Sequence, residues 1–174
     1  AYVRLEHLHT GRLFEALKAL RLTAMIYCPD ISEAGRAHWS GSGLAFSDAP
    51  LDLQEWLGKC RVVVGYAGHG MTVRALLAGR PLLLLPTHLE QRFNAGAAVK
   101  LGAALMAGED ERAPKLKAML QALLGDPQYA GAARRFAEQY AGATGDEGLE
   151  RAIAACEGAF APGEFQVTNV YEVD

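Results

Sequence analysis

The sequence predicts an α/β protein built on a doubly wound parallel sheet, with a helical section toward its C-terminal end. Two observations support this fold class. Four or five short apolar runs alternate along the chain with segments in which apolar residues recur at helical spacing. Within residues 61–91, a strand, a glycine turn, a helix and a second strand follow one another directly. Strands that alternate with helices pair in parallel, and right-handed connections place the helices on both faces, as in a Rossmann-like sheet.

Three of the expected strands lie in the first half of the chain, at residues 1–5, 23–28 and 44–46. Between the first two, Leu and Phe recur every three or four positions over residues 13–20, which predicts a helix with Thr10 as its N-cap. The Gly- and Ser-rich stretch 35–43 is expected to be an exposed loop.

The middle of the chain continues the alternation. A helix is expected over residues 51–57, capped near Asp48 or Pro50. The elements that follow are a strand, a helix, a strand and a helix, at residues 61–64, 71–78, 81–85 and 93–101.

After Gly102 the sequence becomes a helical section, residues 109–160, which ends in a tail over 161–174. Helices are expected at residues 114–124, 129–140 and 147–156. The tail alternates weakly between apolar and polar residues and fits either an edge strand or an irregular end. The chain is expected to form one domain, residues 1–174, and its start inside a strand suggests a piece of a longer protein.

Composition limits the function. The 174 residues are 51% hydrophobic and 21% charged, as in ordinary globular proteins, and the net charge of −3 offers no basic field for nucleic acid. No apolar run approaches the roughly 20 residues that span a bilayer. Cys28, Cys60 and Cys156 lack metal-type spacing, so we expect reduced thiols, no metal site and a cytoplasmic protein without a targeting peptide.

Four segments follow strand ends and should converge on one rim of the sheet, where such folds bind ligands: residues 7–10, 46–48, 65–70 and 87–91. The turn after the fourth strand lets the main-chain N–H groups of Gly70, Met71 and Thr72 face outward at a helix N-terminus, an arrangement that favours phosphate. The Thr72 hydroxyl is expected to add a hydrogen bond. A turn that serves packing alone is the alternative. The glycine spacing fits neither a P-loop nor the dinucleotide fingerprint.

Residues 66–104 read YAGHGMTVRALLAGRPLLLLPTHLEQRFNAGAAVKLGAA. This segment resembles the donor-binding half of GT-B glycosyltransferases that use nucleotide-sugars, especially bacterial enzymes that glycosylate macrolides and flavonoids. Their pattern is close to HGGxGTxxEALxxGxPxLxxPxxxDQxxNAxxxxxxGxG, and the AL, AG, P, LLLP, EQ and NA elements fall in register. A looser similarity extends over residues 1–124.

The resemblance implies transfer of a sugar from a donor such as a UDP- or TDP-sugar to a small-molecule acceptor. The donor is a co-substrate, so no separate cofactor is implied. In that family the general base and the acceptor pocket belong to an N-terminal domain, for which 174 residues leave no room. We therefore expect no catalytic residue in this chain, which should bind a nucleotide-sugar without turning it over.

Carried over residue by residue, the resemblance places the diphosphate beside Gly68, His69, Gly70 and Thr72 and the nucleobase beside Phe46 and Ser47. Glu90 and Gln91 match the pair that holds the donor sugar's hydroxyls. His9 and Thr10 are additional candidates for the diphosphate.

The chain departs from the family pattern at three positions. Tyr66 replaces an imidazole, Met71 replaces a hydroxyl residue, and Arg74 replaces the carboxylate that holds the ribose.

Other readings of these residues stay open. Glu90 and Gln91 also fit a helix cap, Tyr66 and Phe46 fit packed rings, and Arg74 fits a solvated helix face. At the level of the whole chain, the alternatives are a nonenzymatic interaction module that lost donor chemistry, a sugar-nucleotide epimerase, or half of a lipid-linked N-acetylglucosaminyl transferase.

Overall fold

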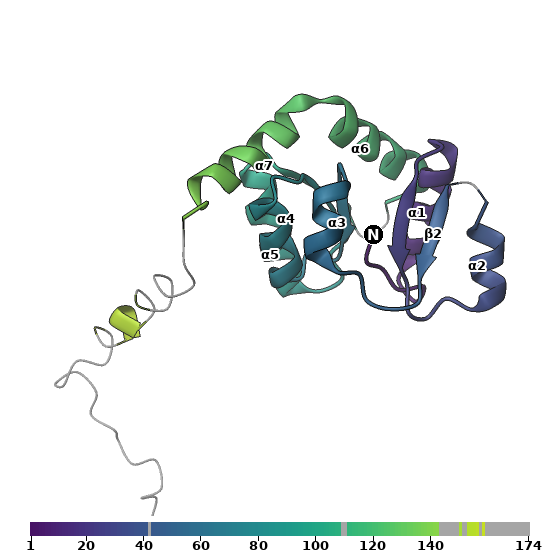
Figure 1. The fold of residues 1–174 in the computed structure, drawn as a ribbon, viewed down its shortest axis with the longest axis horizontal. Coiled ribbons are helices and arrows are strands. Elements are labelled where there is room, and N and C mark those ends of the chain that lie inside the picture. The colour runs from purple at the N-terminus through teal and green to yellow at the C-terminus, as the bar shows by residue number, and fades with distance from the viewer. Residues whose placement is uncertain (42, 109–110, 143–149, 151–152, 157, 159–174) are drawn as a thin grey trace, which may run out of the picture. The chain divides into compact units, whose positions relative to one another are not determined.

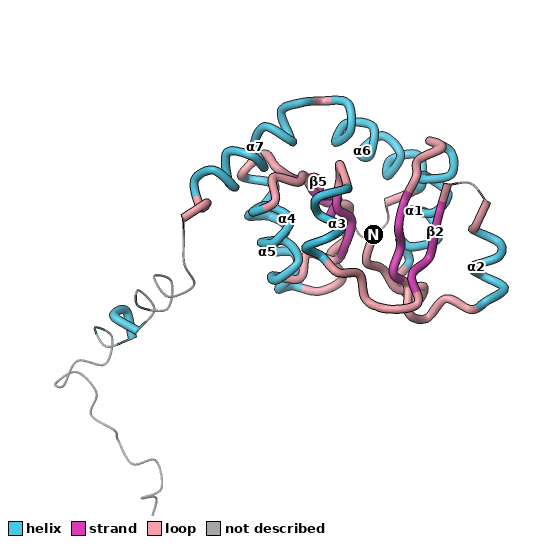
Figure 2. Tube along the Cα trace, viewed as in Figure 1, coloured by secondary structure: helices cyan, strands magenta, loops and turns pink. Residues whose placement is uncertain are grey.

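All strands in the described part of the chain pair in parallel, as the sequence predicts. The computed structural model describes residues 1–41, 43–108, 111–142, 150, 153–156 and 158. One sheet pairs β1 (Ala24–Tyr27) with β2 (Leu44–Ser47). The other places β4 (Leu82–Leu84) between β3 (Val63–Gly65) and β5 (Ala104–Met106). Figure 2 shows these strands in magenta.

Residues 1–3 join the two sheets. Tyr2 forms a parallel bridge with Tyr27 of β1, and its N–H donates to the Val64 carbonyl of β3 at 3.0 Å. The Val3 N–H donates to the Tyr27 carbonyl at 3.0 Å. The strand order is therefore β2, β1, residues 1–3, β3, β4, β5. The chain adds β1 and β2 on one side of residues 1–3 and then β3, β4 and β5 on the other side, so the strand order reverses beside residues 1–3. Such a switch point opens a crevice at the carboxyl ends of the strands.

Seven helices accompany these strands in the described part of residues 1–140: α1 (Leu8–Ala19), α2 (Glu33–Trp39), α3 (Leu53–Lys59), α4 (His69–Leu77), α5 (Leu89–Lys100), α6 (Ala113–Gly125) and α7 (Pro127–Gln139). Helix α6 packs against α1 and helix α7 against α4, so this consecutive pair passes from one face of the sheet to the other (Figure 1). None of the helices in the described part of the chain is long and apolar enough to cross a membrane.

The two hydrophobic cores follow the period of the strands. Leu83 and Leu85 belong to one core with Phe14 of α1 and Leu120 of α6, whereas Leu82 and its strand neighbour Leu84 belong to the other, with the alanines of α4, α5 and α7. Because successive side chains of a strand point to opposite faces, β4 is buried on both sides. This arrangement confirms the doubly wound fold class.

The first helix begins earlier than expected. Helix α1 starts at Leu8 with His7 at its N-cap, and Thr10 lies inside the helix. The prediction of Thr10 as N-cap is wrong because its hydroxyl instead donates to the Arg4 carbonyl at 2.5 Å, fixing the turn that precedes the helix. His7 makes no side-chain capping bond, so the usual N-cap signal was absent.

Two further helices differ from expectation. The stretch 35–43 was expected to be a loop, but helix α2 runs through its first half, since the Ser32 hydroxyl accepts from the Gly35 N–H at 3.1 Å and caps the helix. Helix α3 is capped by Asp52 rather than by Asp48 or Pro50; its carboxylate accepts from the N–H groups of the first turn.

The short strand β5 was not predicted, because three residues between a helix and a loop carry little pattern of their own.

The chain forms two units, Ala1–Tyr140 and Ala141–Asp174. In the second unit residues 150, 153–156 and 158 are helical, in part where residues 147–156 were expected to be. The tail over 161–174 lies outside the described residues.

Candidate functional site

A cavity of about 520 Å³ opens at the carboxyl-end rim of the sheet, at the switch point. Its walls come from residues 1–3, from the segment after β2, from the turn and helix after β3, and from the start of α5. It is lined by Tyr2, Pro50, Leu51, Asp52, Leu53, Tyr66, Gly68, Met71, Arg74 and Gln91. Five residues singled out from the sequence thus meet in one place: Tyr66, Gly68, Met71, Arg74 and Gln91.

The glycine turn leads into an open helix N-terminus. Helix α4 begins at His69, its N-cap is Gly68, and no side chain caps it. The Thr72 N–H donates to the Gly68 carbonyl at 3.0 Å, so the N–H groups of the three preceding residues have no acceptor within the helix. Gly68, His69 and Gly70 are exposed to solvent. This end of the helix carries a partial positive charge and is arranged as a phosphate site requires; phosphate binding itself stays a prediction.

The shape of the turn depends on Ala67. Its φ of 64° lies in the left-handed region that non-glycine residues rarely adopt, and its side chain is fully buried. The Ala67 carbonyl accepts from the Asn94 side chain of α5 at 3.2 Å. Asn94 was absent from the sequence-based site, although it belongs to the NA element of the resemblance. This contact ties the turn to α5 and holds the strained backbone in place.

Tyr66 faces the first β–α loop. Its phenol oxygen accepts from the Arg4 N–H and lies 3.3 Å from the Thr10 hydroxyl, and its ring meets the His7 ring edge-on at 4.6 Å. Burial raises the pKa of Tyr66, opposed by the hydrogen bond with Thr10, so the phenol is neutral near pH 7. The ring lines the cavity, but the hydroxyl is already bonded within the protein.

His9 and Thr10 do not reach the cavity. Their side chains are 4% and 0% exposed, and neither lines its wall. The structure does not support the expectation that they contact the diphosphate, because α1 begins early enough to bury both side chains.

Thr72 is also buried. Its residue is 5% exposed, and its hydroxyl has no hydrogen-bond partner among the described residues. It does not line the cavity, whereas Met71 does. Successive side chains of a helix point about 100° apart. Met71, at the family's hydroxyl position, therefore lines the cavity, whereas its neighbour Thr72 is buried. The expected contact between the Thr72 hydroxyl and phosphate is therefore not supported.

A Thr72→Val substitution tests this placement. It removes a buried hydroxyl without changing the shape of the side chain, so the free energy of unfolding should rise by about 1 kcal/mol. Nucleotide affinity should stay unchanged, because the hydroxyl does not reach the cavity. Urea denaturation and calorimetric titration measure the two quantities. A tenfold weaker affinity with unchanged stability would place the hydroxyl at the ligand after all.

Glu90 and Gln91, at the start of α5, have different surroundings. The Gln91 carboxamide oxygen accepts from the Thr87 N–H at 2.8 Å and from the Thr87 hydroxyl at 3.0 Å. Its NH₂ group makes no hydrogen bond with the described residues and remains available at the cavity wall. Glu90 does not line the cavity. It is exposed in the first turn of α5, where its negative charge interacts favourably with the helix dipole.

The expected nucleobase loop lies slightly off the cavity. Phe46 packs edge-on against Phe14 at 5.6 Å between centroids and belongs to the core periphery. The Ser47 hydroxyl donates to the Ala49 carbonyl at 2.6 Å and shapes the turn. Neither residue lines the cavity. Leu51 and Leu53 do, and sequence reasoning missed them because they read as the apolar face of a helix.

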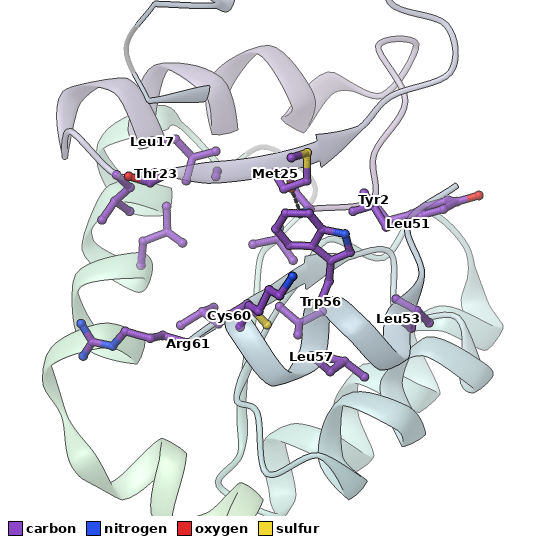
Figure 3. Close-up of a pocket in the computed structure, with 18 of the residues that line it drawn as sticks. Tyr2, Leu17, Thr23, Met25, Leu51, Leu53, Trp56, Leu57, Cys60 and Arg61 are labelled. Carbon is purple, nitrogen blue, oxygen red and sulfur yellow. Dashed lines mark hydrogen bonds between the residues drawn. The ribbon is translucent and has the colours of Figure 1, made fainter. Parts of the chain in front are cut away.

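A second cavity, of about 460 Å³, lies between β1, β3 and the helices α3 and α6. Figure 3 shows Trp56 of α3 pointing into it toward Met25 of β1. Among the described residues that line it, both cationic side chains are already paired: Arg61 donates to the Leu124 carbonyl at 2.8 Å, and Lys59 pairs with Glu55 at 2.5 Å. This apolar chamber lacks the convergent polar groups of a nucleotide site. Among the described residues, no cluster of His, Cys, Asp and Glu could hold a metal.

The fold is that of GT-B glycosyltransferases. The glycosyltransferase VinC, solved in complex with dTDP, superposes with a TM-score of 0.69 at 21% identity, over 90% of this chain and 41% of VinC. The chain belongs to the EryCIII-like C-terminal domain family, the erythromycin biosynthesis protein CIII-like C-terminal domain, whose model matches residues 48–149.

Two curated relatives match parts of the chain. A UDP-N-acetylglucosamine–N-acetylmuramyl-(pentapeptide) pyrophosphoryl-undecaprenol N-acetylglucosamine transferase of Rhodospirillum centenum is 33% identical over an alignment of 133 residues, and the match covers 65% of this chain and 35% of the relative. The elloramycin glycosyltransferase ElmGT of Streptomyces olivaceus is 39% identical over 83 residues, 48% of this chain and 20% of ElmGT. The chain thus spans about a third or less of these two relatives.

Proposed function

We propose that this chain is the donor-binding half of a glycosyltransferase that moves a sugar from a nucleoside diphosphate sugar to a small-molecule acceptor. One observation carries the proposal: the cavity at the switch point adjoins the uncapped N-terminus of α4. The diphosphate would lie on the N–H groups of His69, Gly70 and Met71, with the nucleoside against the apolar wall of Leu51 and Leu53. The family and the dTDP complex of VinC support this reading.

In such a transfer the bond from the sugar's anomeric carbon to the diphosphate breaks while the acceptor hydroxyl bonds to that carbon and loses its proton. The helix N-terminus stabilises the charge that develops on the leaving diphosphate. Among the described residues that line the cavity there is no histidine, and the one carboxylate, that of Asp52, accepts from the N–H groups of Gln54 and Glu55. The general base would come from an N-terminal acceptor domain, so the chain alone should bind without turnover.

Thermal denaturation with UDP, dTDP and GDP tests the binding. A nucleotide present at 100 times its dissociation constant should raise the free energy of unfolding by about 2.7 kcal/mol. The same samples, given UDP-glucose or dTDP-glucose and a phenolic acceptor, should form no glycoside. Stability unchanged by all three nucleotides would favour the interaction module that lost donor chemistry, and rapid product formation would show that the chain carries its own base.

The Rhodospirillum centenum relative favours a second candidate, the donor half of a transferase that moves N-acetylglucosamine to a lipid-linked acceptor. Both candidates use the same cavity, so the donor sugar separates them. A larger rise in stability with UDP-N-acetylglucosamine than with dTDP-glucose would favour the lipid-linked acceptor, and the opposite order would favour the natural-product acceptor.

A further inference from the structure

Arg74 places a positive charge on the wall of the rim cavity. It is the one cationic side chain among the described residues that line this cavity. It is exposed, and no ion pair or hydrogen bond engages its guanidinium within the described part of the chain. Arg80 of the same region differs, since its guanidinium donates to the Leu57 and Gly58 carbonyls and anchors the end of α3.

Helix geometry directs Arg74 toward the open end of α4. Arg74 follows Gly70 by four residues and Met71 by three, so the three share one face of the helix. Side chains on a helix lean toward its N-terminus, which brings a long arginine over the preceding turn. An arginine at this position can therefore extend over the first turn of α4, and Arg74, Gly68 and Met71 line the same cavity.

The neighbouring carboxylate, Asp52, caps helix α3 and forms no ion pair with Arg74 among the described residues. Asp52 also lines the cavity, but its Oδ1 accepts from the Gln54 N–H at 2.9 Å and the Glu55 N–H at 3.5 Å. Across the cavity, the Gln91 NH₂ group is a further donor. Arg74 and the Gln91 NH₂ group thus present donors to a ligand, one of them cationic, and such donors favour an anion.

We propose that Arg74 is the diphosphate-neutralising residue of this cavity, pairing its planar fork with two phosphate oxygens of the bound nucleotide. This inference rests on the proposed function and extends it by assigning the charge partner of the leaving group. It also explains why Tyr66, whose hydroxyl is bonded to the first loop, need not supply a donor to the phosphates. A nucleoside diphosphate should accordingly bind much more tightly than the monophosphate.

Calorimetric titration of the full chain with UDP and UMP tests the assignment, using wild type, Arg74→Gln, Arg74→Lys and the matched control Arg135→Gln. Arg135 is an exposed arginine of α7 outside the cavity. Arg74→Gln should weaken UDP at least tenfold and UMP by less, Arg74→Lys should lie between, and Arg135→Gln should match wild type. The UDP affinity of wild type should also fall more steeply with salt than that of Arg74→Gln.

Three results would overturn the assignment. Equal losses for UDP and UMP in Arg74→Gln would mean that the guanidinium stacks on the base. UDP affinity unchanged in Arg74→Gln would leave Arg74 as a solvated residue that favours the helix dipole, while the proposed function stands. Absence of any nucleotide binding in wild type would contradict both the proposed function and this role of Arg74. Thermal melts followed by circular dichroism check that each variant is folded.

Discussion

Replacing His69 with aspartate is expected to stabilise the protein slightly while removing most of its nucleotide affinity. His69 is the first residue of α4 and is exposed, and a carboxylate there favours the positive end of the helix by about 0.3–1 kcal/mol. The same carboxylate would lie within a few ångströms of a diphosphate bound to that turn. Repulsion between the two should weaken UDP or dTDP binding at least tenfold. Urea denaturation measures the expected gain in the free energy of unfolding, and calorimetric titration measures the expected loss of nucleotide affinity.

The opposite signs separate this result from misfolding, which would lower stability and affinity together. His38→Asp is the matched control, because it makes the same change of charge at an exposed position of α2. The control should bind nucleotide like wild type. If the His69→Asp variant binds UDP as tightly as wild type, the diphosphate does not lie at the start of α4.

An Ala67→Val substitution is expected to lower the free energy of unfolding by about 3 kcal/mol. A β-branched side chain is strained at a φ of 64°, and two extra carbons must enter a site where Ala67 is fully buried. The distorted turn would also misplace the N–H groups at the start of α4, so nucleotide affinity should fall with stability. Chemical denaturation gives the first quantity and titration the second.

Ala67→Gly is the control for this position. Glycine adopts the left-handed conformation without strain but loses a buried methyl group, so the two effects offset each other and stability should change by less than about 1 kcal/mol. A valine variant as stable as wild type would show that the turn adopts another backbone conformation in solution.

The sequence alone carried most of the fold, because strands buried on both faces and helices with one buried face have distinct patterns. Leu82, Leu83 and Leu84 read as a continuous apolar run, and the structure buries all three. The starts of helices were less readable. Helix α1 has no side-chain cap, and the capping residue of α3, Asp52, lies two positions beyond the proline that drew attention.

The site was predictable to the level of segments and not of side chains. Turns that follow strand ends reach the same rim, so Gly68, Met71 and Gln91 meet as expected. Which side chain faces the cavity depends on the phase of each helix and on packing behind it. Thr72 and Phe46 turn inward for that reason, and a pattern of residue types does not contain this phase.

The two cavities share four side chains, Tyr2, Leu51, Leu53 and Met71. These residues therefore lie between the apolar cavity beside Trp56 and the rim cavity. A small aromatic fragment lodged beside Trp56 could be grown through this partition toward the nucleotide, giving inhibitors that draw affinity from hydrocarbon contacts and need not imitate a charged diphosphate.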